Sequence, residues 1–137
     1  MEKLAEAIFV ATEAHYGQFD KAGFPYIAHP FRVMLRLHDE GAHEDLLVAA
    51  ILHDVVEDTN VTLDQVATTF GEDVEVIVDA VSRRDETYME FIARVKASGP
   101  DAIALKLADI ADNTDPRRPR IDKLSERYAK AKELLLS

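Results

Sequence analysis

Apolar residues recur along most of the chain at the three- and four-residue spacing of an α-helix. The stretch that contains Leu46–Leu52 is apolar over most of its surface, which indicates a buried central helix. We find no convincing strand pattern. The periodicity predicts helices over residues 2–16, 30–40, 44–57, 62–70, 72–83, 86–97, 101–113 and 122–136.

Turn-forming and capping residues separate these helices. Glycines and prolines mark a loop over Gly17–Pro30, and Pro30 suits the first turn of a helix that Gly41 would end. Thr62–Gln65 has the pattern of a capping box, which favours a helix start there. Repeats, linkers and low-complexity segments are not evident. We therefore predict one compact all-α domain over residues 1–137, a bundle of about seven to eight helices.

Composition limits the function classes. Hydrophobic residues make up 47% of the 137 residues, enough for a sizeable core, and the formal charge of −10 argues against binding nucleic acid or an anionic membrane. The N-terminus lacks the apolar segment of a secretory signal, and no apolar run reaches roughly 18 residues, so we predict a soluble cytoplasmic protein. Because cysteine is absent, any metal must be held by nitrogen and oxygen. The apolar fraction leaves open whether the protein forms a homo-oligomer.

The most informative string is His53-Asp54-Val55-Val56-Glu57-Asp58, which ends an otherwise apolar helix. Relative to His53, a continuous helix would place Asp54, Glu57 and Asp58 at about 100°, 40° and 140°, on one face. Clustered acids on so apolar a helix would repel one another unless a cation neutralised them. An imidazole beside a carboxylate also suits manganese, iron or zinc. A solvated helix end is an equally good interpretation of this string alone.

Two other polar residues stand at unusual places. His29 lies at the entrance of a helix, where it could equally cap the helix or face solvent. Asp109 lies inside an apolar helix, with Lys106 one turn before it and Asn113 one turn after it. A buried unpaired carboxylate is costly, so either metal ligation or a buried Asp–Lys pair would account for Asp109.

The three motifs together resemble the HD superfamily of metal-dependent phosphohydrolases, which is defined by an isolated His, a His-Asp doublet and a distant Asp on helices. Within it the sequence resembles the hydrolase domain of RelA/SpoT-type proteins and the single-domain small alarmone hydrolases. The resemblance is carried by Ala14–Gln18 with Pro25–Pro30, by Ala50–Thr59, and by Lys106–Asp109 with Asn113.

The resemblance implies an all-α HD domain that hydrolyses a phosphorylated nucleotide. One divalent metal, manganese in the first place, would be held by His29, His53, Asp54 and Asp109. Glu57 and Asp58 would orient and deprotonate the attacking water, while Lys21 and Asn113 would contact substrate. Family members remove the 3′-pyrophosphate of guanosine tetra- and pentaphosphate, and some animal relatives are reported to remove the 2′-phosphate of NADPH.

The sequence departs from the family pattern near the substrate. Asp20 stands where the family commonly has an arginine that stacks on the purine, and Phe24 could supply stacking instead. We therefore carry three hypotheses: a ppGpp 3′-pyrophosphohydrolase, an HD phosphohydrolase for another phosphorylated nucleotide, and a non-enzymatic, metal-stabilised nucleotide-binding module. Arg117, Arg118, Arg120 and Lys123 form a basic patch, and Arg83 and Arg84 form a second one. The candidates for help to a leaving group, most of which we expect to be a solvated surface, are Arg83, Arg84, Arg117 and Arg118.

Overall fold

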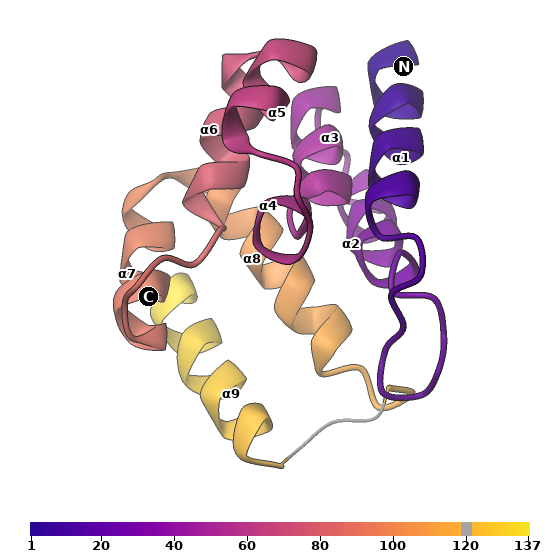
Figure 1. Ribbon diagram of the computed structural model, residues 1–137. Coiled ribbons are helices and arrows are strands. Elements are labelled where there is room, and N and C mark those ends of the chain that lie inside the picture. Colours follow the sequence, from indigo (N-terminus) through magenta and orange to yellow (C-terminus); the bar gives the residue numbers. More distant parts are fainter. Residues whose placement is uncertain (119–121) are drawn as a thin grey trace.

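The computed structural model describes residues 1–118 and 122–137 and confirms the all-α bundle (Figure 1). Arg120, and the side chain of Lys123, lie outside what the structure describes. No helix among the described residues is long and apolar enough to cross a membrane. The helices are α1 (Glu2–Ala14), α2 (Ala28–Asp39), α3 (Glu44–Leu52), α4 (Val55–Asp58), α5 (Leu63–Phe70), α6 (Glu72–Ala80), α7 (Tyr88–Ala97), α8 (Pro100–Asn113) and α9 (Asp122–Leu136).

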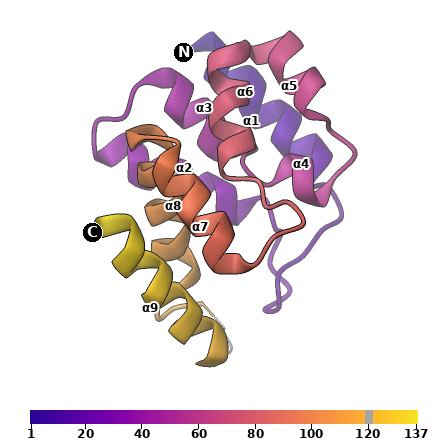
Figure 2. The same ribbon diagram turned by 90° about the vertical axis from the view of Figure 1, so that its left-hand side faces the viewer.

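The centre of the bundle is α3, as the apolar run predicted. Every residue of Leu46–Leu52 is buried, and α3 packs against α1, α2, α6 and α8. The long helix α8 lies below α3 in the view of Figure 1, and α9 runs beside α7 and α8 (Figures 1 and 2). Because α2, α3 and α8 contact one another, polar side chains on their inner faces can meet.

Short-range capping explains where several helices begin. Thr62 accepts a hydrogen bond from the Gln65 backbone while the Gln65 side chain accepts one from Thr62, so the predicted capping box is confirmed. Thr87 and Glu90 form a second capping box at the start of α7. The predicted helix began at residue 86, two residues before Tyr88, because Thr87 was not recognised as a cap.

One predicted helix is two helices in the structure. The expected segment 44–57 ends as α3 at Leu52, and α4 begins at Val55. Between them the backbone stays close to helical, but the Nδ1 atom of His53 bonds the carbonyl oxygen of Ala50 at 2.6 Å. The interruption puts His53 and Asp54 at the junction of two helices rather than on one continuous face.

Candidate metal centre

The four predicted metal ligands come from three separate segments. His29 lies in the first turn of α2, His53 and Asp54 lie between α3 and α4, and Asp109 lies within α8. His29, His53 and Asp109 are buried, and each is at most 5% exposed. His29 is thus neither a surface residue nor a helix cap, the two alternatives that the sequence left open.

The side chains of these residues converge on one point. The Nε2 atoms of His29 and His53 lie 2.8 and 3.3 Å from Oδ1 of Asp109. The same two nitrogens lie 3.7 and 3.2 Å from Oδ2 of Asp54. Ligands held about 2.1 Å from a metal at right angles are about 3.0 Å from each other, so these separations suit one shared cation. Among the described residues, His29, His53 and Asp109 form the group that could hold a metal ion.

The hydrogen bond of His53 to the main chain favours metal binding. A carbonyl oxygen only accepts, so Nδ1 of His53 donates to Ala50 and, in the neutral ring, Nε2 carries a lone pair. That lone pair faces the carboxylates of Asp54 and Asp109, an arrangement that needs a cation or a proton between them. Burial lowers the pKa of His53, but the two carboxylates outweigh it and raise the pKa to about 9.

His29 is oriented by a carboxylate for which the sequence predicted no role. Its Nδ1 atom lies 2.6 Å from Oδ2 of Asp112, which is almost wholly buried. Arg32 donates two hydrogen bonds to Asp112, and Arg118 donates one at 2.8 Å. Arg118 also lies 3.1 Å from Nδ1 of His29, but Asp112 is the closer partner and can accept the ring proton. Burial alone would raise the pKa of Asp112. The hydrogen bonds with His29 and Arg32 outweigh burial and lower this pKa to about 2. Such carboxylate–histidine pairs fix the ring tautomer at metal sites.

The structure shows the buried Asp–Lys pair at Asp109, and this pair leaves one carboxylate oxygen available for a metal ion. Its Oδ2 atom accepts a hydrogen bond from the buried Nζ of Lys106 at 2.7 Å, while Oδ1 faces the two histidines. Burial alone would raise the pKa of Asp109, but Lys106 and the histidines hold it well below the usual range. Asp109 therefore stays ionised, as ligation requires.

Glu57 and Asp58 lie on α4, beside the cluster but not in it. Glu57 accepts a hydrogen bond from the backbone nitrogen of Arg83, and the main chain of Asp58 accepts one from the side chain of Gln18. Burial against the protein raises the pKa of both carboxyl groups, and the charge of Asp54 raises both further. Neither group has a cationic side chain bonded to it in the described structure. A carboxylate with a raised pKa is suited to accept a proton near neutral pH.

Two further polar residues touch the ligands. The hydroxyl group of Tyr26 donates to Oδ2 of Asp54 at 2.6 Å, and burial followed by the charge of Asp54 raises the pKa of Tyr26. Asn113 donates to Oδ1 of Asp109 at 3.3 Å and accepts a hydrogen bond from Arg118. The structure therefore places Asn113 beside Asp109, and its contact with substrate stays a prediction. Tyr26 belongs to the motif Pro25–Pro30, but the sequence predicted no role for its hydroxyl group.

Lys21 is not brought to the cluster. It is exposed on the turn between α1 and α2, and its side chain makes no hydrogen bond or ion pair with the described residues. The neighbouring Asp20 uses its carboxylate to accept hydrogen bonds from the backbone of Ala22 and Phe24, both at 2.9 Å. Asp20 therefore stabilises its own loop, which explains what this residue does where the family commonly has an arginine. Phe24 is 60% exposed and free to contact a ligand.

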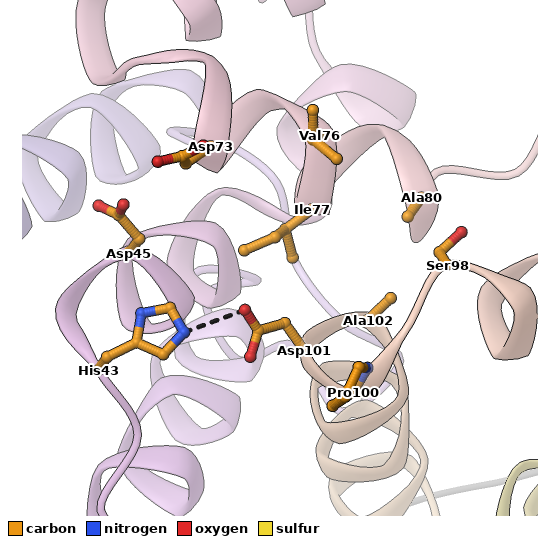
Figure 3. Close-up of a pocket in the computed structure, with 10 residues that line it drawn as sticks. All are labelled: His43, Asp45, Asp73, Val76, Ile77, Ala80, Ser98, Pro100, Asp101 and Ala102. Carbon is orange, nitrogen blue, oxygen red and sulfur yellow. Dashed lines mark hydrogen bonds and ion pairs between the residues drawn. The ribbon is translucent and has the colours of Figure 1, made fainter.

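A cavity of about 150 Å³ adjoins the metal ligands, and its walls include His53, Asp54, Glu57 and Asp109. The molecule has a larger cavity of about 430 Å³ between the starts of α3 and α8 and the side of α6 (Figure 3). That cavity holds a pair between Nε2 of His43 and Oδ2 of Asp101 at 3.0 Å, and it shares no residue with the metal cluster. Size alone would favour the larger cavity, but the converging His and Asp side chains make the smaller one the candidate site.

Comparison with known proteins agrees with this site. A family model described as HD domain matches residues 7–102. The chain belongs to the HD domain family. This membership implies binding of a divalent metal, and the buried His and Asp cluster is where the described structure could hold it.

Relatives of this HD domain protein include much longer enzymes. It is 37% identical, over 82% of its length, to the guanosine-3′,5′-bis(diphosphate) 3′-pyrophosphohydrolase of Aquifex aeolicus. It is 34% identical, over 98% of its length, to a GTP pyrophosphokinase of Streptomyces coelicolor. The chain spans 17% of the length of each of these relatives. A solved structure of a metazoan ortholog of SpoT, described as hydrolysing ppGpp, superposes with a TM-score of 0.83 at 29% identity, covering 99% of this chain and 86% of that one. The predicted RelA/SpoT-type HD domain is thereby confirmed.

Proposed function

We propose that this HD domain protein is a metal-dependent pyrophosphohydrolase that removes the 3′-pyrophosphate of guanosine tetra- and pentaphosphate, leaving GDP from ppGpp. The relatives support the substrate, because one is named as this hydrolase and a metazoan structural neighbour is described as hydrolysing ppGpp. The chemistry of the site supports the reaction type independently of those names.

The proposed metal is a single divalent ion, manganese in the first place, held by His29, His53, Asp54 and Asp109. An ion bound there would lower the pKa of a water molecule and polarise a phosphoryl group. The protein supplies the rest. Asp112, Lys106 and Tyr26 hold the ligands in place, and Asn113 presents polar groups beside Asp109.

The observation that carries the proposal is the position of Glu57 and Asp58. A structural metal site needs no acids beyond its ligands, and extra carboxylates would weaken the fold by repulsion. Here two carboxyl groups with raised pKa lie next to the ligands, one of them lining the cavity. They would orient the attacking water and take its proton. This is why we favour an enzyme over a non-enzymatic, metal-stabilised nucleotide-binding module.

A second candidate is hydrolysis of another phosphorylated nucleotide, such as loss of the 2′-phosphate of NADPH. The motive is Asp20, whose side chain is used within its own loop and cannot replace the family arginine on a purine. Lys21 and the exposed Phe24 on the same loop would then contact a different base. The metal chemistry would be unchanged.

The deciding experiment measures phosphate and pyrophosphate release by manganese-loaded protein from ppGpp, pppGpp and NADPH. Wild-type protein should release pyrophosphate from ppGpp, and Glu57→Ala should lower the rate about 10²- to 10⁴-fold while manganese stays bound. Glu40→Ala, which removes an exposed glutamate at the end of α2, is the matched control and should leave the rate unchanged. Turnover of NADPH without turnover of ppGpp would replace the first substrate with the second. No turnover of any nucleotide, with metal and nucleotide bound, would support the binding module.

A further inference from the structure

The cavity beside the proposed metal ligands has a second wall, whose side chains have no role in the proposed reaction so far. Arg83, Tyr88 and Arg127 line it, from the segment after α6, from the start of α7 and from α9. With about 150 Å³ it is smaller than the roughly 300–1,000 Å³ of a pocket for a whole drug-sized ligand. It therefore suits one chemical group of a larger substrate rather than a nucleoside.

The arginines of this cavity differ from the other arginines of the described chain. Elsewhere each guanidinium contacts a carboxylate, as Arg32 and Arg118 do with Asp112. The same holds for Arg36, Arg84, Arg94 and Arg117, which pair with Asp115, Asp79, Glu86 and Asp115. The Arg83 side chain bonds only the main-chain oxygen of Glu86, and Arg127 has no hydrogen bond or ion pair with the residues that the structure describes. In a protein of charge −10, the two described arginines that contact no carboxylate thus both line the cavity beside the proposed metal ligands.

Two buried polar atoms at this wall have no partner. They are Nε of Arg127 and the hydroxyl oxygen of Tyr88. The guanidinium of Arg127 lies 4.0 Å from the centre of the Tyr88 ring, so the two groups are held together and face the same space. Both can donate a hydrogen bond, and burying a donor without an acceptor is unfavourable. A water molecule would satisfy a donor but would not offset the charge of two guanidinium groups.

A phosphoryl group satisfies both requirements, since it offers several acceptor oxygens and carries negative charge. We propose that Arg83, Tyr88 and Arg127 bind the outer phosphate of a pyrophosphoryl group whose inner phosphate lies at the metal ligands. The inference rests on the proposed hydrolase function and narrows its substrate class to pyrophosphate esters. A monophosphate ester such as the 2′-phosphate of NADPH would leave this subsite empty and gain nothing from it.

The neighbouring lysine does not compete for this role. Lys106 also lines the cavity, but its ammonium group is matched by Asp109 at 2.7 Å. Its charge holds the metal ligand in place, and so the free positive charge of the cavity comes from the two arginines. Arg83 adds a link to the reaction, because its backbone nitrogen bonds Glu57.

The subsite is tested by binding rather than by turnover. Inorganic pyrophosphate and inorganic phosphate are titrated calorimetrically into manganese-loaded protein at one fixed free manganese concentration. Wild-type protein should bind pyrophosphate more tightly than phosphate. Arg127→Met should weaken pyrophosphate binding about 10- to 100-fold and phosphate binding less than about twofold. Tyr88→Phe, which keeps the ring, should weaken pyrophosphate binding by a smaller factor, about threefold to tenfold.

Arg84→Met is the matched control, because Arg84 pairs with Asp79 outside the cavity. It should leave both affinities unchanged. Equal losses for phosphate and pyrophosphate in Arg127→Met and Tyr88→Phe, or no loss in either variant, would overturn the subsite. The two proposals fail separately. Arg127-dependent pyrophosphate binding without ppGpp turnover would keep the subsite and reject ppGpp as the substrate. Turnover of ppGpp with Arg127-independent binding would reject the subsite alone.

Discussion

The two sides of the metal cluster treat their carboxylates in opposite ways. On the α8 side, Asp109 and Asp112 each contact a cationic side chain, and their pKa values are lowered. On the α4 side, Glu57 and Asp58 contact no cationic side chain in the described structure, and their pKa values are raised. The same chemical group is therefore kept permanently ionised where it must hold a ligand in place and left easy to protonate where it would exchange a proton with water.

The largest effect should come from breaking the α8 side at its centre. Asp109→Asn removes a ligand charge and leaves Lys106 buried without its partner, which we expect to cost about 3–5 kcal/mol of unfolding free energy. Metal binding should also be lost. Denaturant unfolding and manganese content measure the two results. The double variant Asp109→Asn with Lys106→Met should recover much of the stability and none of the metal; recovery of neither would mean that the pair is not the source of the cost.

Asp112 sharpens the comparison because it acts on the metal only through His29. Asp112→Asn should weaken manganese affinity about 10- to 100-fold, because the carboxylate would no longer fix the tautomer and orientation of the His29 ring. Asp115→Asn is the control, since Asp115 contacts Arg36 and Arg117 at the same surface but does not contact His29. Competition with a metal chelator gives both affinities. Equal losses in the two variants would show a general effect on local charge instead of positioning.

The metal-free protein should lose stability as pH rises. The pKa of His53 is raised from about 6.5 to about 9 in the folded state, so its protonated form contributes stability below about pH 6.5. That contribution, about 1–3 kcal/mol, should be lost as pH rises through about 9. Thermal unfolding of chelator-treated protein between pH 6 and 10 measures it, and His53→Gln should flatten the profile. An unchanged slope in His53→Gln would assign the pH dependence to other groups.

The smallest effect is expected from the hydroxyl group of Tyr26, an uncharged donor that bonds Asp54 at the start of α4. Tyr26→Phe removes the hydroxyl group that bonds Asp54, so manganese affinity should fall only about threefold to tenfold. Folding should be little changed because the ring remains in place. Metal titration compares this variant directly with Asp112→Asn. A larger loss in Tyr26→Phe than in Asp112→Asn would reverse the ranking of the two sides.

The sequence predicted most of the helices, and it named the side chains that the structure brings together in the buried cluster, because both leave local signals. Apolar periodicity marks a helix, and His29, His53, Asp54 and Asp109 stand in recognisable motifs. The break after Leu52 was missed because the apolar pattern continues through it, and the bond from the His53 ring to the carbonyl oxygen of Ala50 leaves no signal in that pattern.

Residues that support the site through long-range contacts were also harder to find. Asp112 bonds His29 across 83 positions in the chain, and no local pattern reveals such a contact. Its place one turn after Asp109 was the one available hint. The lack of a carboxylate near Arg127 likewise appears only in three dimensions.

The break between α3 and α4 has a consequence for how the chain can vary in length. His53 follows directly on the buried run Leu46–Leu52, so its position is set by the register of the core. One residue inserted into that run would turn His53 by about 100° and move it by about 1.5 Å along the axis, away from Asp109. Insertions and deletions should therefore be excluded from α3.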